Sequence, residues 1–332
     1  MSTTSEALVQ LAEQKEQLRI IANRYLDSAD RLPVDCTLQD IIDVLNEYDE
    51  YTYMNALFNS IEVFPDKDYS INDTKGHIKG LRPYAFYNNT ALKSVNLPAV
   101  TNFDGSLFSN CSNLKKVVIG PISIDNVSGF GALPIEEISM PNLTSIVGSG
   151  GAKSAIFQNL SLLTRVYLPK LSNLSSYSNT FSGCVTLKNV NLPSLTALTA
   201  YYCFHDCDSL KSILVGGRAT ISDRVLFNGK NLLTAFVLTN NDGISTLGGS
   251  SVTNNILSTN AIVYVPASLV SSYQSATNWT TINAQRPIQD IESNINDLRE
   301  LGADFSFTPY ANKKWENDQL IDDPTIGEEV DE

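Results

Sequence analysis

The sequence predicts a mainly β fold with short helices, in which about eight short coils stack into one elongated solenoid. The first observation behind this prediction is a recurring phenylalanine, whose successive intervals from Phe86 to Phe227 are 22, 22, 27, 24, 23 and 23 residues. The second is a set of apolar residues at fixed offsets after each phenylalanine. The third is a proline or glycine that often closes the unit. We expect four regions: an N-terminal helical attachment module (1–50), a linker and N-terminal cap (51–80), the solenoid (81–285), and a C-terminal helix with an acidic tail (286–332).

The repeats share one register. With the phenylalanine as position 0, apolar residues recur at positions 6, 9 and 11, and Asn, Gly or Cys at positions 2 and 3. Alternation at positions 9 and 11 predicts a short strand with one buried face. Near-complete copies are "FYNNTALKSVNLP" from Phe86, "FSNCSNLKKVVIG" from Phe108, "FQNLSLLTRVYLP" from Phe157 and "FSGCVTLKNVNLP" from Phe181. We expect these strand pairs to point into the solenoid: Val95 and Leu97, Val166 and Leu168, and Val190 and Leu192.

A period of 20 to 29 residues with a leucine skeleton is typical of leucine-rich repeat solenoids. These units resemble the BspA-like (Treponema-type) leucine-rich repeat family, over most of residues 81–285. The resemblance implies a binding or adhesion surface and leaves the ligand open, because one such fold serves many ligands.

The N-terminal flank contains a seam of 3-4 spaced residues within "SEALVQLAEQKEQLRIIANRYL". Such a seam is typical of a short coiled coil, and a helix packed on its own domain is the alternative. A second helix is expected in "LPVDCTLQDIIDVLNEY", with Thr37 as its N-cap. The residues expected to mediate oligomerisation are Leu8, Leu11, Leu18, Ala22 and Tyr25.

This pair of helices resembles the N-terminal modules of phage tail and fibre proteins. The resemblance implies a virion protein that is assembled in the cytoplasm of a bacterial host without a secretory signal. Its partners would be other virion proteins, contacted through the N-terminal helices with the C-terminal tail as a second candidate contact, and further copies of itself. A bacterial cell-surface or secreted adhesin of the same repeat family is the alternative.

Charge and cysteine content exclude several classes of protein. The net charge is −13, yet residues 81–285 hold 12 Lys and Arg against 8 Asp and Glu, so the acidity belongs to the flanks. This small surplus does not favour nucleic-acid binding, and no apolar run approaches the roughly 20 residues of a membrane helix. Five cysteines form an odd, sparse set, which predicts free and mostly buried thiols.

Nothing in the sequence predicts catalysis, a metal site or a cofactor. Only His77 and His205 could serve in a triad, and the glycine-rich "VGSGGAKSA" lacks the glycines of a phosphate-binding loop. The stretch "YYCFHDCDSL" looks like a metal site, but its Cys207 occupies position 3 and is expected to fill a turn. Cys203 and His205 fall outside the repeat rule and are expected to share a face, which leaves their role open.

Basic residues recur beside the predicted strands, with aromatic residues near them. A solvated edge that keeps the sheet soluble is one interpretation. The other is a candidate surface for an acidic or carbohydrate polymer, such as a host surface glycan or protein. The candidate ligand-binding residues are Lys93, Lys115, Lys188 and Lys211 at position 7, Lys116 and Arg165 at position 8, and Tyr167 and Tyr264; Leu214 and Val237 lie on the same ribbon.

After the array, the sequence predicts a helix over residues 288–301 that ends at Gly302 and caps the solenoid. Tyr310 and Trp315 are expected on an extended segment, docked on a neighbouring subunit or packed on their own solenoid. The stretch Glu316 to Glu332 carries eight acids and no base. We expect it to be a tail that is disordered unless a partner holds it.

Overall fold

The structure is a computed structural model of the 332-residue chain. It describes residues 15, 16, 19, 33, 36 and 40 near the N-terminus, then residues 69–323 apart from 74–75, 77, 82–83, 104, 126–129, 132, 148–154, 175–178, 201, 223–224, 226–232 and 249–260. The five residues expected to form the oligomerisation seam, and Thr37, lie outside the described residues.

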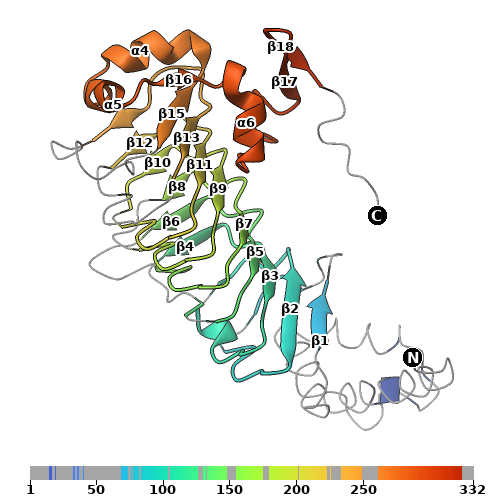
Figure 1. Ribbon diagram of the computed structural model, residues 1–332. Helices are drawn as coiled ribbons and strands as arrows, with labels where there is room; N and C mark the ends of the chain where they lie inside the picture. The colour runs from blue at the N-terminus through green and yellow to red at the C-terminus, as the bar shows by residue number, and fades with distance from the viewer. Residues whose placement is uncertain are drawn as a thin grey trace.

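The chain winds into a mainly β solenoid of about eight coils, which confirms the predicted fold class (Figure 1). One face carries two parallel sheets in line, in the orders β1-β2-β3-β5-β7 and β9-β11-β13-β15-β16. We call this the strand face. Its strands are β1 (Tyr69–Asn72), β2 (Leu92–Leu97), β3 (Lys116–Ile119), β5 (Glu137–Ser139), β7 (Arg165–Tyr167), β9 (Asn189–Leu192), β11 (Ser212–Val215), β13 (Ala235–Leu238), β15 (Ile262–Val265) and β16 (Gln289–Asp290).

A second parallel sheet of short strands, in the order β4-β6-β8-β10-β12-β14, lies on another side of the coils. Its strands are β4 (Ser123–Asp125), β6 (Ser145–Val147), β8 (Asn173–Leu174), β10 (Ala197–Leu198), β12 (Thr220–Ile221) and β14 (Thr246–Leu247). A short 3-10 helix, η1 (Gly105–Phe108), forms one of the turns. Each middle coil therefore contributes one strand to each side, and the apolar side chains between them form a continuous core.

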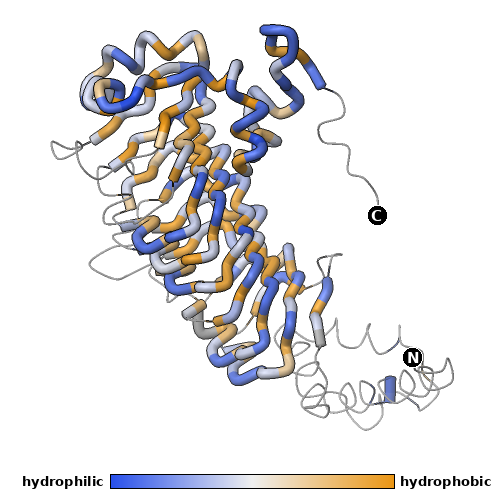
Figure 2. Tube along the Cα trace, in the orientation of Figure 1, coloured by the Kyte–Doolittle hydropathy of each residue, from blue (hydrophilic) through white to orange (hydrophobic). Residues whose placement is uncertain are grey.

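The phenylalanines at position 0 stack into a spine through this core. Figure 2 shows the hydrophobic segments recurring from coil to coil. Ring centroids are 5.2 Å apart for Phe86 and Phe108, and 4.9 Å apart for Phe157 and Phe181. The described position 0 phenylalanines are at most 3% exposed. The strand residues predicted to point inward are buried, except Val166, which is only partly buried.

Position 2 has a backbone reason for its Asn, Gly or Asp. The residues there are left-handed, with φ of +60° at Asn88, +65° at Asn110, +62° at Asn159, +76° at Gly183 and +54° at Asp206. Asn and Asp tolerate this region because their short side chains hydrogen-bond locally, and Gly has no Cβ to clash. The Asn110 Nδ2 donates to the Asn88 Oδ1 at 2.8 Å, so these two side chains also link neighbouring coils.

Position 3 holds a ladder of thiols. Cys111, Cys184 and Cys207 are free and fully buried. Their Sγ atoms donate to main-chain carbonyls of the preceding coil, those of Phe86, Phe157 and Phe181, at 3.0, 3.1 and 3.0 Å. Burial raises the pKa of Cys111 to about 11 and that of Cys184 to about 12, so both thiols stay protonated at neutral pH. The predicted small turn fillers are confirmed.

Two short helices, α4 (Val270–Ser275) and α5 (Trp279–Gln285), follow a 3-10 turn, η2 (Ala267–Leu269), and close the C-terminal end of the solenoid (Figure 1). Tyr273 and Trp279 join the core edge to face, with centroids 5.1 Å apart. The Trp279 Nε1 donates to the Ser245 carbonyl at 2.8 Å, and the Tyr273 hydroxyl accepts from the Ser245 N–H at 2.8 Å. The end cap is thus built from these helices and not from the helix predicted over residues 288–301.

That predicted helix is shorter and lies elsewhere. Its residues form β16, a 3-10 turn η3 (Glu292–Asn294) and α6 (Ile295–Glu300), which lies beside the strand face (Figure 1). Gly302, with φ of +94°, ends α6 as predicted. The Gly302 N–H donates to the Arg299 carbonyl at 2.8 Å, and the Ala303 N–H donates to the Leu298 carbonyl at 2.9 Å. This is the Schellman pattern, in which a left-handed residue lets the chain turn back onto its own helix.

The chain after Gly302 packs on its own solenoid. We call this segment, together with η3 and α6, the strap (residues 291–323). Tyr310 is 5% exposed and its hydroxyl donates to Glu292 Oε1 at 2.9 Å, while Trp315 is partly buried. Of the two alternatives expected for these residues, packing on their own solenoid is the one that the structure shows. Residues Lys313–Glu316 (β17) and Gln319–Asp322 (β18) form an antiparallel hairpin, so the acidic stretch begins as an ordered element and not as a disordered tail.

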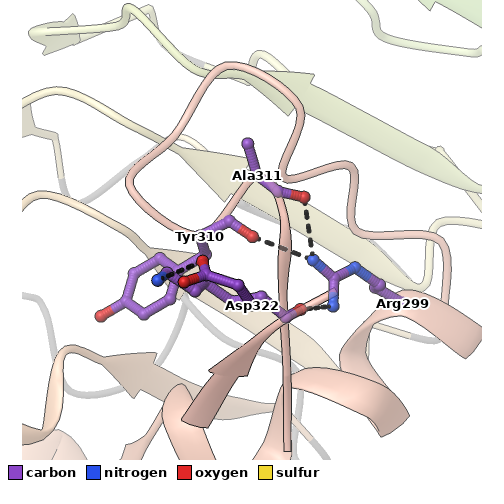
Figure 3. A network of polar contacts seen from close by, with 5 residues as sticks. Arg299, Tyr310, Ala311 and Asp322 are labelled. Carbon is purple, nitrogen blue, oxygen red and sulfur yellow. Dashed lines mark hydrogen bonds and ion pairs between the residues drawn. The ribbon is translucent and has the colours of Figure 1, made fainter. Parts of the chain in front are cut away.

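Arg299 holds the hairpin to α6 (Figure 3). Its guanidinium donates to the carbonyls of Tyr310 and Ala311 at 2.9 and 3.2 Å, and also to the Lys313 carbonyl. The Lys313 Nζ contacts the Asp322 carboxylate at 2.6 Å across the two strands. The hairpin turn is Asn317 and Asp318, both left-handed, as a two-residue turn between twisted strands requires.

Candidate functional site on the strand face

Positions 8 and 10 of each repeat point outward from the strand face, and their character changes along the solenoid. From β2 to β9 they are mostly polar or charged, and they are partly or fully exposed. From β11 to β15 they are small or apolar, and all but Ile262 are buried. The outward pairs in order are Ser94 and Asn96, Lys116 and Val118, Glu137 and Ser139, Arg165 and Tyr167, Asn189 and Asn191, Ser212 and Leu214, Ala235 and Val237, and Ile262 and Tyr264.

The strap explains the change. Leu214, Val237 and Tyr264 form a second hydrophobic cluster with strap residues that include Leu298 and Phe305. We call β9, β11, β13 and β15 the covered half of the strand face, and β1, β2, β3, β5 and β7 the open half. Tyr264 is 9% exposed beneath the strap, so its expected place on an exposed ribbon is wrong.

The expected row of stacked positive charge is interrupted by acids from the coil of β5. The Lys116 Nζ lies 2.9 Å from Glu137 Oε2, and the Arg165 Nη1 lies 3.1 Å from Glu137 Oε1. In the neighbouring row the Lys115 Nζ lies 2.7 Å from Glu136 Oε1. Lys116 and then Arg165 hold the pKa of Glu137 below its usual value against the opposing effect of burial. The middle of the open half therefore carries mixed charge and not a basic stripe.

The other predicted lysines lie where the register places them. Lys93, Lys188 and Lys211 are exposed, one per coil, at the start of their strands. The Lys211 N–H donates to the Lys188 carbonyl at 2.7 Å, so neighbouring coils keep the row in line. The structure brings Lys115, Lys116, Arg165 and Tyr167 together on the open half, and the Lys115 N–H donates to the carbonyl of Lys93 on the adjacent strand at 2.8 Å.

A pocket of about 380 Å³ lies at the boundary between the halves. The first sheet ends at β7 and the second begins at β9, although the two strands are neighbours. The partly buried Val166 lines this break. The other lining residues are Thr164, Arg165, Tyr167, Leu168 and Pro169 from one coil, Asn189, Asn191 and Pro193 from the next, and Gly302, Asp304 and Phe307 from the strap.

Two asparagines of β9 fix the strap at this boundary. The Asn191 Oδ1 accepts from the Asp304 N–H at 3.0 Å and its Nδ2 faces the Gly302 carbonyl at 3.4 Å. With its amide oriented to satisfy its neighbours, Asn189 donates to the Leu301 carbonyl at 2.6 Å and to Ser212 Oγ at 2.9 Å. A Cβ at residue 302 would lie 2.2 Å from this amide, so a glycine is required for the close approach.

Sequence reasoning missed Asn189, Asn191, Asp304 and Phe307. The signal available was the run of outward apolar residues from Leu214 onward, which on an uncovered sheet would be exposed. The register shows which residues point outward but not which distant segment covers them. No local pattern links β9 to residues more than a hundred positions later.

The metal interpretation of "YYCFHDCDSL" finds no support in the described part of the chain, where no group of three or more His, Cys, Asp or Glu could hold an ion. Cys203 is fully buried, whereas the side chain of His205 reaches the surface and its Nδ1 lies 2.9 Å from Asp206 Oδ2. They do not share a face, contrary to expectation. Among the described residues, no helix has the length and apolar character needed to cross a membrane.

A family model agrees with this architecture. A search of curated proteins returned no match. Among solved structures, a leucine-rich repeat protein from Bacteroides ovatus ATCC 8483 is 20% identical, with a TM-score of 0.36 over 60% of this chain and 55% of that one. This chain thus spans about half the length of that protein. The model of the BspA type leucine rich repeat region matches residues 70–150 and 152–283 in six copies. The chain belongs to the BspA-type leucine-rich repeat family.

Proposed function

We propose that this is a non-enzymatic recognition protein whose open half of the strand face binds a ligand on a host surface. The observation that carries the proposal is the asymmetry of the face: the strap buries one half, whereas the other half keeps its outward side chains in solvent. Among the described residues, those side chains are amides, hydroxyls, ion-paired groups, the aliphatic Val118 and the ring of Tyr167. Such a mixture resembles the composition of transient binding surfaces more than that of a permanent subunit interface.

For the setting, we propose a virion, with the N-terminal module attaching the protein to other virion components as a homo-oligomer. Several weak sites on one oligomer would then act together without any chemical step. This placement depends on the resemblance of residues 1–50 to tail and fibre modules. The membership of the BspA-type family favours the second candidate equally, a cell-surface or secreted bacterial adhesin.

The test measures adhesion of the labelled full-length chain to intact cells. Ser139→Arg places a large side chain in the middle of the open half, where Ser139 is partly exposed on β5. Ser123→Arg makes the same change at an exposed site of β4, in the second sheet, and is the matched control. We expect Ser139→Arg to reduce adhesion at least about tenfold, and Ser123→Arg to leave it unchanged. Equal adhesion of both variants contradicts recognition by the open half.

The two settings differ in where the protein is found and what it adheres to. Detection of the chain in purified phage particles, together with adhesion to bacterial cells, supports the virion setting. Detection on the bacterial surface or in culture medium, with adhesion to animal cells or matrix, supports the adhesin. Light scattering in solution tests the homo-oligomer separately, and a monomer at micromolar concentration contradicts it.

A further inference from the structure

The boundary pocket is formed by two coils and the strap, and hydrogen bonds hold the strap backbone on the coils before any ligand binds. The amides of Asn189 and Asn191 are occupied by the backbone of residues 301–304, and the Asp304 Oδ1 accepts from the N–H and hydroxyl of Ser306 at 2.9 and 2.5 Å. Walls held in this way lose little conformational freedom on binding, which favours affinity.

Two aromatic rings, one from a coil and one from the strap, line the same pocket and lie in contact with each other. Tyr167 on β7 and Phe307 on the strap have ring centroids 6.1 Å apart and planes inclined by 56°. They are 39% and 55% exposed, although large aromatic side chains of a fold usually bury more of their surface. Exposed ring faces pack well against the flat, C–H-rich face of a sugar ring, which is apolar although its rim is polar.

The remaining polar groups of the pocket can serve a hydroxyl-rich ligand. Arg165 offers N–H donors, and Asp304 offers a second carboxylate oxygen that has no hydrogen-bond partner among the described residues. The Tyr167 hydroxyl likewise makes no hydrogen bond within that part of the structure, and it can both donate and accept. Burial, followed by the nearby Asp304 carboxylate, raises its pKa, so this hydroxyl keeps its proton.

We propose that this pocket binds a neutral saccharide, one or two sugar units at a time, with Tyr167 and Phe307 packed on the sugar and Arg165 and Asp304 bonded to its hydroxyls. The inference rests on the proposed function, since it names the ligand class of the same strand face. Arg165 and Asp304 carry opposite charges, and Arg165 is already paired with Glu137. A charged ligand would therefore be repelled by one of these two groups, and the cost of removing water from its charge would not be fully offset. A hydroxyl can accept from Arg165 and donate to Asp304.

The size of the pocket agrees with this ligand class. Its volume of about 380 Å³ lies at the small end of ligand pockets, which span about 300–1,000 Å³. The protein would thus recognise a polymer through the one or two sugar units that occupy the pocket. The rest of the chain would lie along the open half.

The experiment titrates the full-length chain by calorimetry with neutral oligosaccharides of glucose, galactose, mannose and N-acetylglucosamine, and with uronic-acid and sulfated oligosaccharides. We expect binding of at least one neutral probe. Tyr167→Ala and Phe307→Ala should each weaken it about tenfold. Tyr87→Ala removes another half-exposed ring, which packs against Tyr84 away from the pocket, and should change nothing.

Three outcomes would overturn the inference: binding of none of the neutral probes, tighter binding of the acidic probes, or neutral binding that is equal in Tyr167→Ala and wild type. The cell-adhesion test separates this failure from failure of the proposed function. If Ser139→Arg abolishes adhesion while Tyr167→Ala and Phe307→Ala do not, the open half recognises its ligand without the pocket. If Ser139→Arg has no effect either, the proposed function fails as well.

Discussion

The open and covered halves of the strand face have the same coil geometry and opposite surfaces. Val118 on β3 and Val237 on β13 occupy the same position 10 of the repeat, yet Val118 is partly exposed and Val237 is fully buried. The inward residues beside them are equally buried in both halves. The comparison shows that the repeat fixes the core, whereas a segment outside the repeat decides which part of the surface is available to a ligand.

The largest expected effect comes from placing a carboxylate at this one position in each half. Val237→Asp buries an unpaired charge under the strap and should lower the free energy of unfolding by about 3–5 kcal/mol. Val118→Asp leaves its carboxylate in contact with water and should cost under about 1 kcal/mol. Urea denaturation followed by tryptophan fluorescence compares them, since Trp279 is in the end cap and Trp315 in the strap. Equal costs would mean that the strap does not cover this strand.

A smaller effect is expected at the contact that organises the strap. Arg299→Lys keeps the charge but loses the planar group that reaches three carbonyls, and should cost about 1–3 kcal/mol. Hydrogen exchange should accelerate in residues 303–323 and leave β2 and β3 unchanged. Arg165→Lys, at an exposed arginine of the open half, is the control. Faster exchange throughout the solenoid would show that the strap is part of the global core.

The strap also predicts a dependence on alkaline pH. Burial and then the Glu292 carboxylate raise the pKa of Tyr310 well above its ordinary value of 10.0. The unfolded chain releases this proton near pH 10 whereas the folded chain retains it, so stability is full below pH 10 and falls as the pH rises above it. Tyr310→Phe should cost about 1 kcal/mol at pH 8 and flatten the decline between pH 10 and 11. If stability declines as steeply with pH in Tyr310→Phe as in the wild type, the decline is due to the titration of other groups.

The smallest effect is expected in the ion-pair ladder of the open half. Lys116→Ala should change the free energy of unfolding by under about 0.5 kcal/mol, because exposed ion pairs contribute little. The pKa of Glu137 should rise toward its ordinary value of 4.5. Any stabilisation from this lowered pKa is present above that value and is lost as the pH falls through the folded-state pKa. A titration of the carboxyl by NMR checks both points, and a cost comparable to that of Arg299→Lys would contradict the contrast between the halves.

The sequence was a good guide to features that repeat. Asn88, Asn110 and Asn159 mark the left-handed turn because few residues accept that backbone, and Gly302 ends α6 for the same reason. It was a poor guide to surfaces. Nothing in the sequence singles out Glu137, yet parallel register places it between Lys116 and Arg165. Tyr264 was interpreted as exposed because the alternation of a strand shows which way a side chain points and not whether another segment covers it.

By itself the sequence determined the coil: its length, its phenylalanine spine, its turn residues and the inward side of each strand. These features depend on local backbone limits and on a spacing that every repeat restates, so they can be deduced from residues close together in the chain. Only the tertiary structure decided that residues 291–323 fold back over β9 to β15 and leave a pocket beside β7. That choice depends on contacts between segments distant in the chain, 113 residues apart for Asn191 and Asp304, whose complementarity appears only when both are in place.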